Sequence, residues 1–212
     1  MSLRLGDIAP NFKATSTTGA IDFYQWLGDH WCMLCLRSGG FTPVCATELV
    51  RTAELKTAFY ERGVKIIATG KASLELLSYH LNDIQETNKV VVDFPLLADE
   101  DGRIASLYGM MPANEEVLEP MCSLFIIGPD KTIKLTTAYP TSTGRNFHEI
   151  LRAIDSLQLT ADYQVATPVD WEWGEDVFIL PTLSEAAVEE KFPKGYETVK
   201  PYMRITPQPV LK

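Results

Sequence analysis

The sequence lacks a long apolar run, an excess of basic residues and a dense set of cysteines. No apolar stretch approaches the roughly 20 residues that a membrane-spanning helix needs, and the N-terminus has no basic-then-apolar signal, so we expect no membrane span. The net charge is −9, and a polyanion does not attract nucleic acid, so no nucleic-acid partner is expected. Four cysteines among 212 residues form no evident disulfide framework. A reducing, cytoplasmic location is the expectation.

Strand-like and helix-like segments alternate along the first three quarters of the chain. Apolar runs of strand length cover residues 31–37, 64–69, 94–99, 123–127 and 133–138. Helical spacing follows Cys45 until Gly63, then recurs over residues 72–84, after Gly102 and over 146–157. This alternation predicts an α/β layer around a mainly parallel sheet. Prolines become frequent and periodicity fades from about residue 160, so we predict domains at 1–159 and 160–212.

The segment from Phe41 to Leu49, Phe-Thr-Pro-Val-Cys-Ala-Thr-Glu-Leu, places Cys45 in the first turn of the first long helix. Pro43 suits a first helical turn, where its missing N–H costs nothing. Unpaired backbone N–H groups and the positive end of the helix dipole favour an anion there, and a thiolate is an anion. Against this, a cysteine among apolar residues and threonines is more often a small buried hydrophobe.

The same segment resembles the peroxidatic loop of the peroxiredoxins, and the resemblance extends over nearly the whole chain. Residues 5–12 resemble the opening of that family's main domain, residues 128–131 its late hairpin and segments within 139–152 the helix that follows. Residues 157–160, 165–171 and 206–209 resemble the C-terminal domain of its one-cysteine, type 6 branch. The resemblance implies a thioredoxin-like fold with a central mixed, mainly parallel sheet flanked by helices, and a small C-terminal domain, residues 160–212, that helps to form a homodimer.

For function, the resemblance implies a thiol peroxidase. Cys45 would attack hydrogen peroxide or an organic hydroperoxide and become a sulfenic acid, which an external thiol would reduce. Thr42 matches the family threonine beside the sulfur, and Glu48 and Arg145 match its surrounding polar network. The alternative for Thr42 is a plain helix cap. The alternative for Glu48 and Arg145 is an ordinary salt bridge. No cofactor and no metal is expected.

Three positions depart from the family pattern. Cys122 stands where the catalytic arginine is expected, residues 37–40 (Arg-Ser-Gly-Gly) replace a His-Pro stretch, and His80 stands where a tryptophan is usual. These exchanges predict a wider pocket with a weaker positive field. Arg37 is a candidate replacement for the missing charge, because the end of its strand lies near Cys45; the alternative is that it points to solvent.

Two further questions stay open in the sequence. Cys122 is a packing residue, a resolving thiol for Cys45, or part of a soft-metal site with Cys45 and His80. Cys32 and Cys35 lie inside a strand, where three-apart side chains face opposite ways, so both are predicted to be core. The alternative function is a peroxiredoxin fold repurposed to bind, or react with, a larger organic substrate in a widened pocket around Cys45, Cys122 and Arg37.

Overall fold

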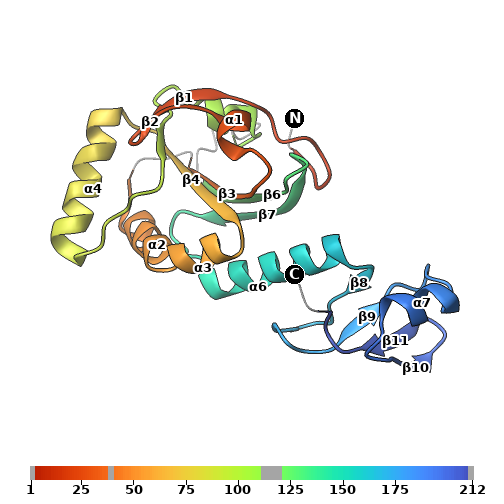
Figure 1. The fold of residues 1–212 in the computed structure, drawn as a ribbon. Helices are drawn as coiled ribbons and strands as arrows, with labels where there is room; N and C mark the ends of the chain where they lie inside the picture. The colour runs from red at the N-terminus through yellow and green to blue at the C-terminus, as the bar shows by residue number, and fades with distance from the viewer. Residues whose placement is uncertain (1–2, 38–40, 111–120, 210–212) are drawn as a thin grey trace. The chain divides into compact units, whose positions relative to one another are not determined.

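The computed structural model describes residues 3–37, 41–110 and 121–209. The chain divides into two compact units, 1–147 and 148–212 (Figure 1). Helix α6 (Phe147–Asp162) begins the second unit, although its first residue, Phe147, is counted with the first unit. The boundary predicted between residues 159 and 160 lies near the other end of the same helix and stays a prediction.

The first unit is a mixed sheet with flanking helices. Its described strands are β1 (Lys13–Ser16), β2 (Gly19–Asp22), β3 (Trp31–Arg37), β4 (Val64–Gly70), β5 (Leu96–Ala98), β6 (Met121–Ile127) and β7 (Ile133–Pro140). Its described helices are α1 (Phe23–Leu27), α2 (Pro43–Glu54), α3 (Lys56–Glu61), α4 (Leu74–Asn88) and α5 (Arg103–Leu107). The strand order is β2-β1-β5-β4-β3-β6-β7. Parallel pairing is confined to β3–β4 and β4–β5, and the outer strands are antiparallel.

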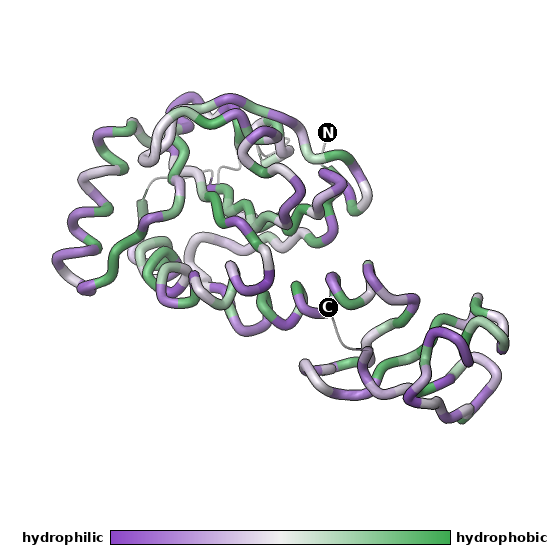
Figure 2. The backbone as a smooth tube through the Cα atoms, viewed as in Figure 1, coloured by the Kyte–Doolittle hydropathy of each residue, from purple (hydrophilic) through white to green (hydrophobic). Residues whose placement is uncertain are grey.

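Strand β3 lies inside the sheet and is buried on both faces, which explains its continuous apolar sequence (Figure 2). Cys32 and Leu34 pack in an apolar cluster to which α1 and α5 contribute. Cys35 and Arg37 instead line a cavity together with residues of α2. Cys32 and Cys35 thus lie on opposite faces and both are buried, as the alternation predicts.

The first long helix is interrupted, which the sequence did not predict. Helix α2 ends before Leu55, whose ψ of 4° is not helical, and α3 begins after it. Hydrogen bonds from Leu55 N–H to the Arg51 carbonyl (3.1 Å) and from Phe59 N–H to the Leu55 carbonyl (3.2 Å) bridge the break. The predicted stop at Gly63 is observed, with φ at 65°, a left-handed value that favours glycine.

Strands β6 and β7 form the predicted hairpin. Gly128 N–H donates to the Thr132 carbonyl at 3.0 Å, and Lys131 N–H donates to the Gly128 carbonyl at 3.0 Å. The pairing sets Cys122 opposite Tyr139 on one side, and opposite Arg37 of β3 on the other. The register of β6 therefore decides what lies beside the end of β3.

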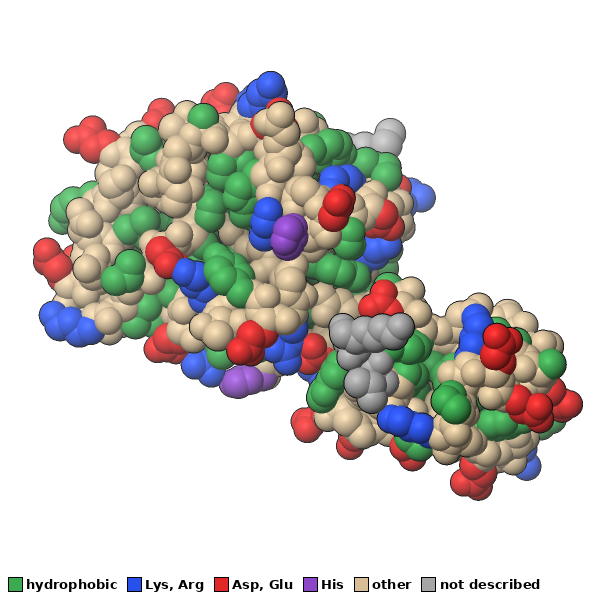
Figure 3. All heavy atoms as spheres, in the orientation of Figure 1, with side chains coloured by type: hydrophobic (Ala, Val, Ile, Leu, Met, Phe, Trp, Pro, Cys, Tyr) green, Lys and Arg blue, Asp and Glu red, His purple; other side chains and the backbone are tan. Residues whose placement is uncertain are grey.

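The second unit has its own small sheet and core. Its elements are α6, β8 (Val165–Ala166), β9 (Val177–Ile179), α7 (Glu185–Lys191), β10 (Glu197–Lys200) and β11 (Met203–Thr206), with the antiparallel strand order β10-β11-β9-β8. Trp171 is 1% exposed at the centre of this core, and its indole N–H donates to the Glu175 carbonyl at 3.1 Å. Charged side chains of both signs are spread over the face of each unit drawn in Figure 3. In the described ranges no helix is both long and apolar enough to cross a bilayer.

Helix α5 depends on one buried carboxylate, and this generates a first prediction. Asp99 is 2% exposed and accepts from the backbone N–H groups of Ile104 (2.8 Å) and Ala105 (3.0 Å). Asp99→Ala leaves both donors buried and unpaired, so we expect a loss of about 2–3 kcal/mol in the free energy of unfolding, measured by urea denaturation. Asp99→Asn, which keeps one acceptor oxygen, should lose less, and Asp101→Ala, at an exposed position, should lose under about 1 kcal/mol. Equal losses for Asp99→Ala and Asp101→Ala would contradict this role.

Candidate active site around Cys45

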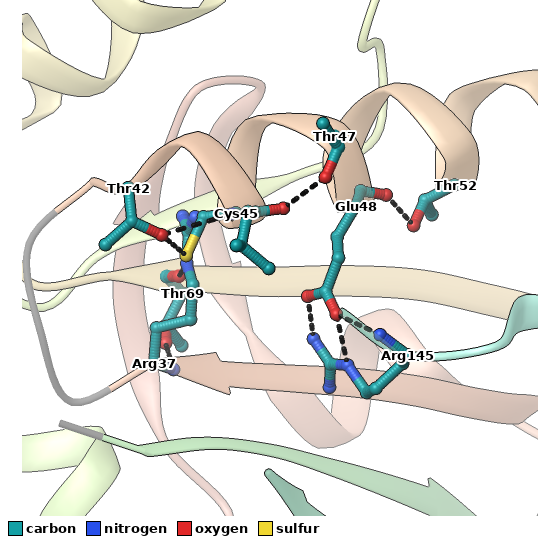
Figure 4. A network of polar contacts seen from close by, with 9 residues as sticks. Arg37, Thr42, Cys45, Thr47, Glu48, Thr52, Thr69 and Arg145 are labelled. Atoms are coloured by element: carbon teal, nitrogen blue, oxygen red, sulfur yellow. Dashed lines mark hydrogen bonds and ion pairs between the residues drawn. The ribbon is translucent and has the colours of Figure 1, made fainter. Parts of the chain in front are cut away.

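Cys45 lies in the first turn of α2, where Thr42 fixes both the start of the helix and the surroundings of the sulfur. Thr42 is the N-cap: its Oγ1 accepts from the backbone N–H of Cys45 at 3.2 Å. The same hydroxyl donates to Cys45 Sγ at 3.1 Å (Figure 4). The two alternatives for Thr42, helix cap and hydrogen-bond donor to the sulfur, are therefore realised together.

The Arg37 side chain extends from the last residue of β3 toward the Cys45 sulfur (Figure 4). Arg37 is only 6% exposed, and its Nε donates to the Thr69 carbonyl at 3.0 Å while its backbone N–H donates to Thr69 Oγ1 at 3.2 Å. The charge of its guanidinium lowers the pKa of Cys45. The Nη1 atom is buried and has no hydrogen-bond partner among the described residues. Arg37 does not point to solvent, and its charge lies beside Cys45.

The charge state of Cys45 follows from these neighbours. A hydrogen bond from the Cys122 thiol, together with the charge of Arg37 and the hydroxyl of Thr42, lowers the pKa of Cys45 to about 4, although burial opposes the shift. The same hydrogen bond to Cys45, reinforced by burial, raises the pKa of Cys122. One sulfur is thus a thiolate at neutral pH, and the other is a neutral thiol that donates to it.

Glu48 and Arg145 form a buried ion pair one helical turn after Cys45. The Nε and the backbone N–H of Arg145 both donate to Glu48 Oε1 at 2.9 Å, and its Nη2 pairs with Glu48 Oε2 (Figure 4). The Arg145 side chain is 3% exposed and the Glu48 side chain is 9% exposed. Burial opposes the charge of Arg145, but the Glu48 carboxylate outweighs it and raises the pKa of Arg145. The pair therefore fixes α2 against the segment that precedes α6.

His80 approaches the site through an aromatic contact. Its ring stacks on Phe41, with centroids 4.1 Å apart and an angle of 6° between the planes. The guanidinium carbon of Arg37 lies 5.7 Å from the centroid of the same Phe41 ring. Sequence reasoning missed Phe41 and Thr69 as neighbours of Arg37. Thr69 could have been found, because β3 and β4 are parallel and the ends of parallel neighbours meet at one sheet edge.

The cavity that Cys45 lines is small. It has a volume of about 20 Å³, which is room for about one water molecule. It is bounded by Cys35, Arg37, Cys45, Glu48, Leu49, Thr52, Ile66, Ala68, Phe94, Arg145 and Phe147. The prediction of a widened pocket is wrong for this cavity, because the long Arg37 side chain lies in its wall and does not leave the protein interior.

All four cysteines are free thiols in the structure. Over residues 3–37, 41–110 and 121–209, no three His, Cys, Asp or Glu side chains are arranged to hold a metal ion. The alternative of a soft-metal site formed by Cys45, Cys122 and His80 therefore gains no support from the described residues. Cys122 is 4% exposed and lies beside the site, directly opposite Arg37 in the β3–β6 pair.

Two family models match this chain. The AhpC/TSA family matches residues 5–136, and the C-terminal domain of 1-Cys peroxiredoxin matches residues 156–195. The 1-Cys peroxiredoxin of Dictyostelium discoideum is 44% identical over 207 residues, covering 98% of this chain and 86% of that protein. Peroxiredoxin-6 of Rattus norvegicus is 48% identical over 220 residues, covering 98% of each chain.

Solved structures show the same similarity. A yeast mitochondrial 1-Cys peroxiredoxin superposes with a TM-score of 0.89 at 40% identity, over 97% of this chain and 99% of its own. A peroxiredoxin 6 of Arenicola marina superposes with a TM-score of 0.86, also at 40% identity, over 98% of this chain and 99% of its own.

The neighbours of Cys45 generate a second prediction, about pH. Because its pKa is lowered, the thiolate persists as pH falls and is lost only near about pH 4. We expect the rate of iodoacetamide alkylation at Cys45, followed by mass spectrometry, to be nearly constant between about pH 6 and 8, where a free thiol of pKa about 8.5 gains reactivity steeply. Cys122→Ala and Arg37→Met should each move the midpoint upward by roughly 1–2 units.

Cys122→Ser is the matched control, since a hydroxyl in place of the thiol still donates to the Cys45 sulfur. Its midpoint should lie closer to that of the unaltered protein than the midpoint of Cys122→Ala does. A midpoint in the unaltered protein near that of a free thiol would contradict the assignment.

Proposed function

Because this chain belongs to the AhpC/TSA family and is a thiol peroxidase of the one-cysteine peroxiredoxin type, we propose that Cys45 is its peroxide-reactive residue. The resemblance drawn from the Cys45 segment is confirmed by the family matches, and the thioredoxin-like fold is confirmed by the solved relatives. The observation that carries the assignment of Cys45 is the Arg37 guanidinium, which is buried beside the sulfur at the start of α2.

The proposed step is attack by the Cys45 thiolate on one oxygen of a hydroperoxide. An S–O bond forms, the O–O bond breaks, and the departing oxygen takes up a proton and leaves as water or an alcohol, so that Cys45 becomes a sulfenic acid. The unpaired Nη1 of Arg37 is a buried donor available to the oxygen on which negative charge develops. Thr42 holds the sulfur, because its hydroxyl donates to Sγ.

Glu48 and Arg145 are proposed as positioning residues. Their ion pair fixes the turn of α2 that follows Cys45, and thereby the direction in which the sulfur points. The proposed substrates are hydrogen peroxide and small organic hydroperoxides, and the proposed reductant is an external thiol. No observation favours the repurposed alternative, since the cavity beside Cys45 is too small for a larger organic molecule.

We further propose a homodimer formed along β7. Among the described strands β7 pairs only with β6, at one end of the sheet. Its first residue, Ile133, is covered by backbone bonds to Gly6 and Asp7, and no other described strand pairs with the rest of its outer edge, which we propose to pair with a second copy. Light scattering after size-exclusion chromatography should give the mass of two chains; the mass of one chain at every concentration would count against this.

The proposed compartment is the cytoplasm. The support is that all four cysteines are free thiols, as expected of a protein kept in a reducing environment. Fractionation of cells that express the chain would test this, and recovery from an oxidising compartment would rule it out.

The third prediction concerns the reaction with peroxide. Mixing the reduced protein with hydrogen peroxide should give a fast single-turnover change in tryptophan fluorescence that is absent in Cys45→Ser. Arg37→Met keeps the length of the side chain but removes the charge and the donors, so the rate should fall by roughly 100-fold. Arg51→Met is the matched control and should react at the unaltered rate. Arg51 lies on α2, the helix that carries Cys45, but its side chain is half exposed and pairs with Glu54. Equal rates for Arg37→Met and the unaltered protein would remove Arg37 from the mechanism.

A further inference from the structure

Cys122 lies where its thiol can reach Cys45 because of the register between β3 and β6. Arg37 and Cys122 are directly opposed in this antiparallel pair. Directly opposed residues project from the same face of a sheet, with their β-carbons about 4.5–5.5 Å apart. Arg37 lines the cavity on the α2 face together with Cys45, so Cys122 belongs to the same face.

Cys122 is the group with the largest effect on the pKa of Cys45, and both thiols are shielded from solvent. Cys45 is 2% exposed and Cys122 is 4% exposed. Cys35 is the other thiol on this face and lines the same cavity as Cys45, so it is the alternative internal thiol. Cys122 is the thiol that most affects the pKa of Cys45, and it is therefore the one we take to react with whatever forms on the Cys45 sulfur.

We propose that Cys122 is an internal resolving thiol, so that this chain completes its oxidation with an intramolecular disulfide between Cys45 and Cys122. This rests on the proposed function, because peroxide supplies the oxidation. The Cys122 sulfur attacks the sulfur of the Cys45 sulfenic acid, the S–S bond forms and the S–O bond breaks. The proton of Cys122 leaves with the hydroxyl group as water. Two equivalents of an external thiol then return both cysteines to the reduced state and become a disulfide themselves.

Oxidation of Cys45 itself prepares Cys122 for this step. In the reduced state the Cys45 thiolate accepts the Cys122 proton, and this hydrogen bond is the main cause that holds the pKa of Cys122 high. A sulfenic acid is uncharged, so that hydrogen bond to an anion and the repulsion from it both disappear once Cys45 has reacted. Burial and the charge of Glu48, which raise the pKa of Cys122, remain, and so does the charge of Arg145, which lowers it. The pKa of Cys122 should therefore fall once Cys45 has reacted, because its largest upward cause is gone.

The bond also requires the backbone to permit it. A disulfide needs α-carbons within about 7 Å of each other, and Cys45 sits in the first turn of a helix. The cap bonds of Thr42, the bond from Ala46 N–H to the Thr42 carbonyl (3.0 Å) and the bond from the Thr47 hydroxyl to the Val44 carbonyl (2.7 Å) hold that turn, so a movement of the first turn of α2 must loosen them. The buried pair of Glu48 and Arg145 keeps the rest of the helix in place.

The test is to oxidise the fully reduced protein with one equivalent of hydrogen peroxide in the presence of dimedone, which traps sulfenic acid. Free thiols are then blocked with a maleimide, and the protein is examined by intact and peptide mass spectrometry. We expect two of the four thiols to be lost and a peptide pair linked through Cys45 and Cys122. In Cys122→Ser the sulfenic acid has no internal partner, so a dimedone adduct should accumulate at Cys45. Cys35→Ser is the matched control for a thiol on the same face, and should form the disulfide as the unaltered protein does.

The outcomes separate the inference from the function on which it rests. A dimedone adduct at Cys45 in the unaltered protein, with Cys122 still free, would overturn the internal resolving role and leave Cys45 as the peroxide-reactive residue. Four free thiols after peroxide treatment would remove both. A disulfide that forms equally in Cys122→Ser would show that another thiol resolves Cys45, and would also overturn the inference.

Discussion

Everything around Cys45 serves one requirement, that a negative charge be held in the protein interior. A buried thiolate is costly because it loses the hydration that water provides, and burial alone pushes the pKa of a thiol upward. Here the cost is offset by a guanidinium from β3, a hydroxyl at the helix start and a thiol from β6. Arg37 and Thr42 lie within eight residues of Cys45 in the sequence, and the pairing of β6 with β3 brings Cys122 to them, so all three groups act on the sulfur only when α2 and the sheet are assembled.

The arginine of this site stands on β3, directly opposite the β6 position at which the peroxiredoxin resemblance predicts one. The peroxiredoxin resemblance leads one to expect an arginine at position 122, and the residue directly opposite is Arg37. A long side chain from either strand can reach the start of α2, because opposed side chains share a face. The exchange leaves a cysteine in the vacated position, and this is why the site contains both a strong positive field and a second sulfur.

Sequence reasoning predicted the strand before Cys45 and the helix that carries it, because periodicity and the placement of Pro43 are local signals. It also predicted the hairpin at residues 128–131, for the same reason. It could not predict whether the Arg37 side chain points to solvent or to the interior, because its direction depends on the contacts of Arg37 with Thr69 of β4 and with helix α2. It expected a wider pocket by counting side-chain volumes at two positions, and missed that a third residue would occupy the space. The interruption at Leu55 has no local marker in the sequence, since no glycine or proline lies there.

The pair of Glu48 and Arg145 divides α2 into parts of unequal local stability. Glu48 is held by three hydrogen bonds from Arg145, and its carbonyl accepts from the Thr52 hydroxyl at 2.7 Å, so the helix is anchored from its second turn onward. Fraying from the N-terminus can therefore proceed through Cys45 and stop at Glu48 without unfolding the sheet. Because Cys45 is 2% exposed, the free energy of such a local opening includes the cap bonds of Thr42 and also the burial of the Cys45 side chain. A peroxide-reactive residue placed there can change its surroundings within microseconds to milliseconds while the fold that keeps it charged stays intact.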